Sequence, residues 1–183
     1  MKKVICFFLI ITVTFLGLIV IQYYNSEYYR FHTQFQLGWD ALTDEKGDEA
    51  LKYWLPIAKE GNEAAQLWVY QTYADGYGGV KRESDLALYW CNKYKCNKLG
   101  SSCEANNKIK NNQDCAFNIA FAFANDGPGE PRFDFNESIK WLKISSSLGN
   151  ESATKIIVNC VNKKFLNESA APACLKNQFK KRI

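Results

Sequence analysis

Small residues recur along the chain at a fixed interval of eleven positions, and this interval constrains the fold more than any other feature. It separates consecutive members of two series, Ala65–Gly76–Ala87 and Ala116–Gly127–Ser138–Gly149. The motif Gly-Asn-Glu-x-Ala also occurs twice, beginning at Gly61 and at Gly149. Such self-similarity predicts a repeat architecture, in which each unit needs its neighbours to bury its apolar side. Stacked repeats usually present a surface that holds another macromolecule, so we expect a binding function.

Charge is concentrated at the two ends of the chain. The 183 residues carry a formal net charge of +4, and 47% of them are hydrophobic, which is enough to bury a core. The terminal cations are Lys2, Lys3, Lys176, Lys180, Lys181 and Arg182. Because the middle is nearly neutral, it lacks the basic stripe that nucleic-acid binding requires. We interpret the basic tail as a solvated helix end.

An uncharged apolar run from Val4 to Ile21 follows the two N-terminal lysines. The run is about long enough to span a bilayer, and the lysines would keep its start cytoplasmic. Tyrosines that suit a membrane interface follow directly: Tyr23, Tyr24, Tyr28 and Tyr29. We therefore predict an uncleaved signal anchor over residues 1–24. The alternative is a signal peptide whose cleavage releases the protein into the periplasm.

The cysteines favour an exported protein. Besides Cys6 there are six: Cys91, Cys96, Cys103, Cys115, Cys160 and Cys174. An even set in an exported domain is typical of a disulfide framework. Cys160 and Cys174 are isolated from the others and are expected to pair, whereas the remaining four allow three pairings. The alternative of a zinc site is disfavoured by the absence of a C-x-x-C motif and by a single distant histidine, His32.

Apolar periodicity predicts an all-α fold in which helix, turn and antiparallel helix alternate. Gly47 is expected to stop the first helix, Asp48 to cap the second, and Pro56 to kink the second or shift its first turn. Residues 99–113 are polar and are predicted to form an inserted loop. The expected helices span 28–42, 49–59, 62–75, 83–98, 114–125, 136–148 and 150–165, with a short terminal helix after Pro172.

These residues resemble the Sel-1-like repeat, a relative of the tetratricopeptide repeat. One unit contains Ala65, Tyr73, Gly76, Gly78, Gly79, Val80, Asp85, Ala87 and Trp90. An earlier unit contains Leu37, Gly38, Ala50, Tyr53, Trp54, Ala58 and Gly61, and a later one contains Ala116, Gly127, Gly129, Ser138, Trp141 and Gly149. The resemblance covers roughly residues 28–161. It implies a short right-handed α-solenoid over 28–165, interrupted at about 100–113, followed by a capping helix and basic tail over 166–183.

The resemblance also implies cross-links and binding residues. Some exported members tie one helix pair to the next by a disulfide, which implies a bond from Cys96 to Cys103 or Cys115. First helices of such solenoids line the concave face, so aromatic side chains exposed there would be binding anchors. The candidates are Trp68, Tyr70, Phe117, Phe121 and Phe123. Trp54, Trp90 and Trp141, on the second helices, are expected to pack between helices.

Sequence motifs associated with catalysis, phosphate binding or metal binding are scarce. Asp75-Gly76 and Asp126-Gly127 place an acid at the same point of two repeats, but Asp before Gly is typical of helix ends and turns. The sequence contains no phosphate loop, nucleophile elbow or metal signature. We therefore expect no enzyme activity, no catalytic residue, no cofactor and no metal.

Three functions compete. The first is a protein-binding repeat protein in the bacterial inner membrane, facing the periplasm. The resemblance implies that its partner is a secreted antibacterial effector, such as a phospholipase of a type VI secretion system, so that the chain would be an immunity protein. The second is an envelope adaptor that helps to assemble membrane proteins. The third, an enzyme acting on cell-wall material, would depend on Asp75 and Asp126 alone.

Overall fold

Helices account for all the regular structure in the part of the chain that can be described. The computed structural model describes residues 2–98, 105–125, 133–161 and 170–180, with side chains left out for 2–11, 95–98, 105–111 and 180. The helices are α1 (Lys2–Thr43), α2 (Gly47–Lys59), α3 (Glu63–Asp75), α4 (Ser84–Lys98), α5 (Ala105–Ala124), α6 (Phe135–Ser147), α7 (Glu151–Cys160) and α8 (Ala170–Lys180), with a 3₁₀ turn, η1 (Tyr77–Gly79). The predicted all-α class is confirmed.

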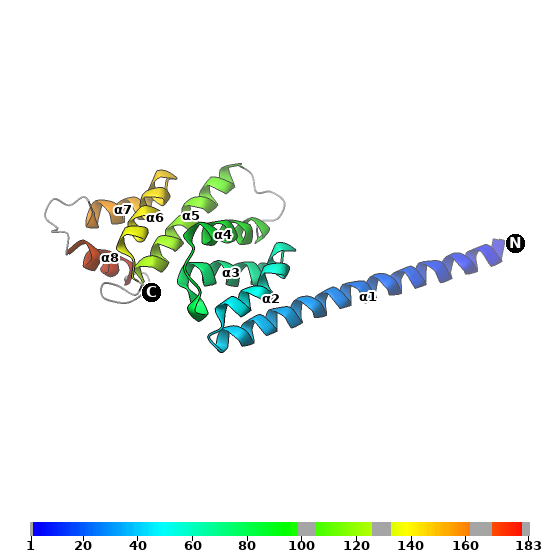
Figure 1. Cartoon of the computed structure of the whole chain (residues 1–183). Coiled ribbons are helices and arrows are strands. Elements are labelled where there is room, and N and C mark those ends of the chain that lie inside the picture. The colour runs from blue at the N-terminus through cyan, green and yellow to red at the C-terminus, as the bar shows by residue number, and fades with distance from the viewer. Residues whose placement is uncertain (1, 99–104, 126–132, 162–169, 181–183) are drawn as a thin grey trace.

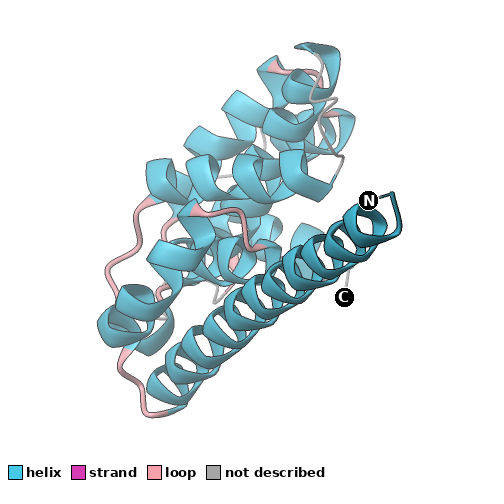
Figure 2. Ribbon diagram, turned by 90° about the vertical axis from the view of Figure 1, so that its right-hand side faces the viewer, coloured by secondary structure: helices cyan, strands magenta, loops and turns pink. Residues whose placement is uncertain are grey.

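Each helix packs against its neighbours in sequence, from α1 against α2 to α7 against α8, and α5 also contacts α3 and α8. The body therefore extends as a row of helices, while the N-terminal half of α1 projects from one end of it (Figures 1 and 2). One hydrophobic cluster joins α1, α2 and α3 and includes Trp90 of α4. A second joins α5, α6, α7 and α8 and includes Ala74 of α3 and Ala87 of α4. Tyr70 and Tyr73 on α3 pack against both clusters and connect them.

The repeated Gly-Asn-Glu-x-Ala motif is a helix–turn–helix joint. Gly61 and Gly149 have φ values of 103° and 100°, a left-handed conformation that ends the preceding helix and favours glycine. The next residue, Asn62 or Asn150, caps the following helix, because its side chain accepts the backbone N–H three positions on. The alanine that closes each motif is fully buried. The motif thus specifies both a chain reversal and a buried contact.

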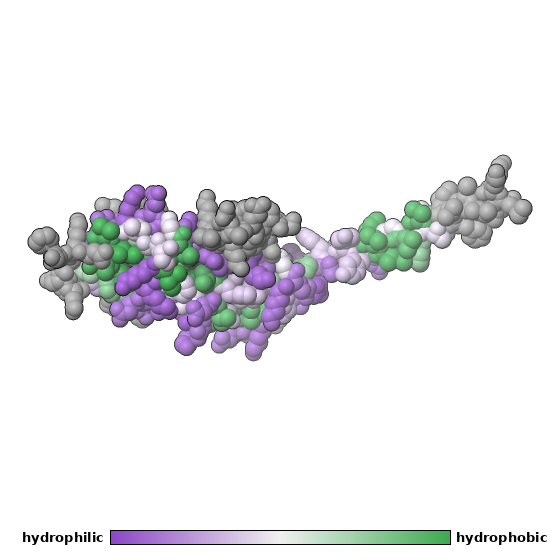
Figure 3. Space-filling view, turned by 90° about the horizontal axis from the view of Figure 1, so that it is seen from above, coloured by the Kyte–Doolittle hydropathy of each residue, from purple (hydrophilic) through white to green (hydrophobic). Residues whose placement is uncertain are grey.

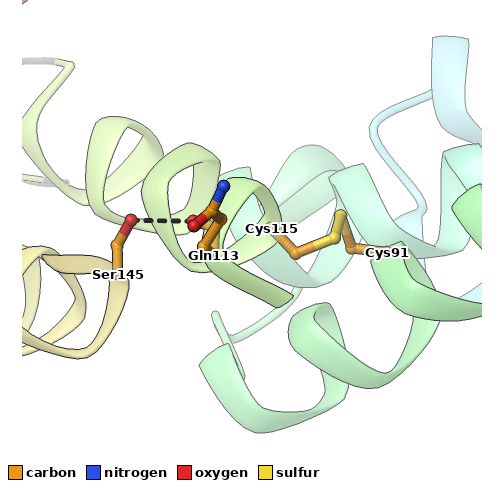
Figure 4. Close-up of a disulfide and its surroundings, with 4 residues drawn as sticks. All are labelled: Cys91, Gln113, Cys115 and Ser145. Carbon is orange, nitrogen blue, oxygen red and sulfur yellow. Dashed lines mark hydrogen bonds between the residues drawn. A yellow bond between two sulfur atoms is a disulfide. The ribbon is translucent and has the colours of Figure 1, made fainter. Parts of the chain in front are cut away.

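The small residues of the eleven-residue interval serve two purposes. Ala65, Ala87, Ala116 and Ser138 are fully buried where helices approach closely, whereas Gly76 and Gly149 are left-handed turn residues. Gly127 lies outside the described residues. On α6, Ser138 and Ser145 donate hydrogen bonds of 2.7 Å to carbonyls of Ala120 and Gln113 on α5, the second of which is drawn in Figure 4. The eleven-residue interval therefore marks positions where helices pack closely and positions where helices end.

Two disulfides are present among the described cysteines. Cys160 pairs with Cys174, as predicted, and links α7 to α8. Cys91 pairs with Cys115 and links α4 to α5, next to the hydrogen bond between Ser145 and Gln113 (Figure 4). The alternative bond from Cys96 to Cys115 is therefore wrong, since Cys115 is occupied. Cys96 and Cys103 themselves lie outside the described side chains.

Several helix boundaries differ from the prediction. Residues 105–113, predicted as loop, form the start of α5; they contain no Gly or Pro, so their polar composition alone does not interrupt a helix. Gly47 begins α2 instead of ending α1, and the residue at the N-cap of α2 is Lys46, not Asp48. Helix α2 also continues through Pro56 to Lys59. Helix α7 ends at Cys160, earlier than the predicted 165.

The predicted anchor at 1–24 belongs to α1, which continues without a break to Thr43. The separate helix expected from residue 28 is thus the C-terminal part of α1. Within the described residues, none of the helices combines the length and apolar character that crossing a bilayer requires. The side chains of residues 2–11, which make up much of the predicted anchor, are outside that description.

Candidate interaction surface

The five predicted binding aromatics are wholly or partly buried. Phe117 and Phe123 belong to the second hydrophobic cluster and are buried, so these two candidates are not exposed as a binding anchor would have to be. Phe121 is half-buried and meets Phe179 of α8 edge-on, with ring centroids 5.1 Å apart. Tyr70 lies between the two clusters, and burial, followed by the nearby Asp75 charge, raises the pKa of its hydroxyl. The terminal helix α8 covers this side of α5. The periodicity of apolar residues within α5 does not by itself predict that another helix lies there.

Trp68 is the one candidate that borders an exposed aromatic surface. Its ring meets Trp39 of α1 edge-on with centroids 4.6 Å apart, and Tyr77 of η1 lies 6.3 Å away on centroids. Trp39 is 37% exposed and Tyr77 is 36% exposed, while Trp68 is half-buried between them. We call these three residues the aromatic patch. It joins the first helix, the third helix and the turn after it.

Turn geometry places Tyr77 in the patch. Gly76, Gly78 and Gly79 all have positive φ values, between 60° and 77°, which lets the chain reverse sharply after α3. Gly78 lies directly against Gly47 at the start of α2, where a Cβ on Gly78 would approach the Gly47 Cα to 2.6 Å. The carbonyl of Tyr77 lies close to the same glycine. The glycine-rich turn after α3 is thus docked on α2, and this contact fixes Tyr77.

The patch rests on a rigid base. Trp54 of α2 is fully buried beneath Trp68, at a centroid distance of 5.9 Å. Its indole N–H donates to the carbonyl of Phe35 on α1 at 3.1 Å. Trp54, Trp90 and Trp141 are all buried, as predicted. An exposed aromatic pair held by buried rings loses little side-chain entropy when it binds, which suits a binding anchor.

Two hollows open on either side of the turn between α2 and α3. The first, of about 370 Å³, is lined by Ala58, Lys59, Glu60, Gly61, Gln66, Tyr89, Trp90 and Lys93. The second is a largely apolar groove of about 270 Å³, lined by Tyr28, Phe31, His32, Phe35, Asn62 and Ala64. His32, expected to be a surface or packing residue, is exposed and stacks on Tyr28.

One ion pair lies at this turn. The guanidinium of Arg30 on α1 binds the carboxylate of Glu60 in a bidentate manner, with one N–H to O distance of 2.9 Å. Hydrogen bonding to Arg30 lowers the pKa of the Glu60 carboxyl below its ordinary value, and hydrogen bonding to Glu60 raises the pKa of Arg30.

A second acid, Glu137, connects α6 to α4. One carboxylate oxygen of Glu137 on α6 accepts hydrogen bonds from the hydroxyl of Ser84 on α4 at 2.8 Å and from the indole of Trp141 at 2.9 Å. Lys140 donates to the same oxygen at 2.8 Å. Burial raises the pKa of Glu137, but the three hydrogen bonds outweigh it and hold the pKa below its ordinary value.

Only one residue of the predicted acid pair, Asp75, lies in the described part of the chain. Asp75 is the last residue of α3, directly before the left-handed Gly76, as expected for a turn; Asp126 lies outside the described residues. In the described part of the chain, no group of three His, Cys, Asp or Glu side chains is arranged to hold a metal ion. Searches of protein-family models, curated proteins and solved structures found no match to this chain.

Proposed function

We propose that the chain is a Sel-1-like repeat protein that binds another protein through the aromatic patch. The observation that carries this proposal is an exposed Trp39 and Tyr77 flanking Trp68 on a base of buried rings. Large aromatic residues on a rigid support are the side chains that dominate binding energy at protein interfaces. The contacts of each helix with its neighbours in sequence support the solenoid that the repeat pattern predicts.

We further propose that residues 1–24 anchor the protein in the bacterial inner membrane, with its body in the periplasm. Nearly every described residue of α1 from Thr12 to Arg30 is exposed, although many are apolar. Figure 3 shows a hydrophobic stretch of α1 outside the body, with paler and hydrophilic residues between it and the body. Water does not favour so large an exposed apolar surface, whereas lipid does. The disulfides support an oxidising compartment. In this setting the protein is an immunity protein for a secreted antibacterial effector, as the repeat resemblance implies.

The test is capture of a partner by the full-length protein in detergent under oxidising conditions, followed by mass spectrometry. The W39A/Y77A variant should lose the partner at least tenfold, because it removes both exposed anchors. The matched control is L86A, which truncates an exposed apolar side chain on α4. Equal capture by all three proteins would contradict the proposed site.

A second measurement examines the immunity role. A toxin encoded beside this protein should kill cells that carry W39A/Y77A and spare cells that carry the wild type or L86A. Capture of several envelope proteins, with no protection against any toxin, would favour the envelope adaptor instead.

A further inference from the structure

The helix directions place one edge of the body toward the predicted anchor. Helix α1 runs into the body from its N-terminus, and α2 returns antiparallel to it, so the turn between α2 and α3 points back along α1. Helix α4 also ends on the side from which α1 projects (Figure 1). We call the α2–α3 turn and α4 from Tyr89 to its C-terminus the anchor-side edge. Both hollows described above open at this edge.

The two edges of the body differ in charge. The anchor-side edge carries Lys59 and Lys93, neither of which forms an ion pair with a described residue. It also carries two acids: Glu60, which pairs with Arg30, and Glu63 at the start of α3. Lys95 and Lys98 follow Lys93 along α4. Acids gather instead at the opposite edge, where α2 and α4 begin: Asp44, Glu45, Asp48, Glu49, Glu83 and Asp85. The acids at the starts of α2 and α4 complement the dipoles of these two helices. Because Arg30, Lys59 and Lys93 outnumber Glu60 and Glu63, the anchor-side edge carries a net positive charge.

Aromatic side chains accompany these cations. Tyr89 is 52% exposed beside Lys93, whose ammonium lies 5.8 Å from the centre of the tyrosine ring. Tyr28 and Phe31 line the apolar groove on the other side of the α2–α3 turn. Cations next to amphipathic rings suit the headgroup region of a bilayer, where tyrosine concentrates.

We propose that the anchor-side edge lies against the surface of a bilayer that contains anionic phospholipid. This inference rests on the proposed anchor. Nine residues separate Ile21 at the end of the apolar run from Arg30 at the edge, which corresponds to about 14 Å along the helix. The headgroup layer of one leaflet occupies roughly 5–8 Å of that distance. The remaining gap of roughly 6–9 Å is comparable to the Debye length of about 8 Å at physiological ionic strength, so the lysines sense the charge of the lipid.

The experiment places a photo-crosslinking benzoylphenylalanine at Tyr89 in the full-length protein, reconstituted into vesicles of phosphatidylcholine with or without phosphatidylglycerol. The matched control carries the same group at Tyr77, an exposed tyrosine at the opposite edge. In anionic vesicles, lipid labelling from position 89 should exceed that from position 77 at least fivefold. It should also exceed labelling from position 89 in neutral vesicles. Equal labelling from the two positions would overturn the proposal.

The lysines are then tested in the same assay. The K59E/K93E variant should lose at least tenfold of the labelling from position 89 in anionic vesicles, since each basic residue near such a surface contributes about a fivefold preference. K143E, the same charge change at an exposed lysine of α6, should retain it. If K59E/K93E labels as well as the wild type, charge does not hold the edge at the lipid and the proposal is wrong.

Flotation of the vesicles separates this inference from the proposed function. Protein that does not float with either type of vesicle lacks the anchor, so the proposed anchor and the docking of the edge are both wrong, while binding through the aromatic patch is judged by partner capture. Protein that floats but does not label lipid from position 89 retains the anchor, and only the docking of the edge is wrong.

Discussion

The indole ring of Trp54 lies directly against the backbone of Gly38, in the space that a side chain at Gly38 would fill. A Cβ built on Gly38 would lie 2.6 Å from Cδ1 of Trp54, well inside van der Waals contact. Gly38 belongs to α1 and Trp54 to α2, so this contact brings together the two helices that support the aromatic patch. Leu37-Gly38 is also the Leu-Gly pair on which the resemblance to a repeat unit partly depends, and the buried tryptophan explains why glycine is needed there.

Replacing Gly38 with alanine should therefore destabilise the protein. Alanine favours a helix by about 1 kcal/mol over glycine, but overpacking against a fixed indole costs about 1–3 kcal/mol. We expect a net loss in the free energy of unfolding, measured by urea denaturation with tryptophan fluorescence. Gly17 is the control, because it lies in the same helix with open space around it. A G38A protein as stable as G17A would show that Trp54 can move aside.

Alanine substitutions at Gly78 and Gly79 of η1 provide a second matched comparison. Gly78 and Gly79 both have left-handed φ values, so alanine costs about 1–2 kcal/mol at either position. Only at Gly78 would the new Cβ also strike the backbone of Gly47, whereas nothing lies within 4 Å at Gly79. We expect G78A to lower the Tm, followed by circular dichroism, further than G79A does. Equal shifts would mean that the contact between η1 and α2 is loose.

The disulfide between Cys91 and Cys115 joins the part of the body built on α4 to that built on α5. Closing a loop of 24 residues stabilises a protein by about 3 kcal/mol, chiefly by restricting the unfolded chain. The C91A/C115A variant should lose roughly this amount and should exchange amide hydrogens faster in both α4 and α5. In C160A/C174A the faster exchange should be confined to α7 and α8. If amide exchange became equally faster throughout the chain in both variants, each disulfide would not stabilise its own pair of helices and the prediction would be wrong.

The sequence predicts much of this fold because helix ends have local causes. The paired Gly-Asn joints at Gly61 and Gly149 specify their turns through a left-handed glycine and an asparagine cap, both visible in the motif. The start of α5 is not predicted, since residues 105–113 are polar and lack a cap signal. The exposed pair Trp39 and Tyr77 is also missed as a site. Their exposure depends on how η1 docks on Gly47, a contact between residues thirty positions apart in sequence.

The hydrogen bonds of Glu137 make stability depend on pH. Its pKa is held below its ordinary value in the folded protein, mainly by Lys140 and Ser84 acting against burial, while the unfolded chain has a pKa of about 4.3. The stabilisation is therefore fully present above pH 4.3 and disappears as pH falls through the lower, folded pKa. E137Q should be less stable than the wild type at pH 7, and the difference should shrink at pH 3. A constant difference in the urea midpoint across this range would contradict the assignment. E151Q, which removes an exposed pair at 4.0 Å, should match the wild type at pH 7.

The last prediction separates binding from stability within the tryptophan cluster. Trp39 and Tyr77 are more than a third exposed, so W39A/Y77A should lower the free energy of unfolding much less than W54A does. Removing the fully buried Trp54 leaves a large cavity and removes the indole hydrogen bond to the Phe35 carbonyl, and should cost about 3–5 kcal/mol. The comparison uses urea unfolding of the three proteins under oxidising conditions. If W39A/Y77A unfolded as readily as W54A, the patch would be part of the core, and the loss of partner capture could not be assigned to an exposed binding surface.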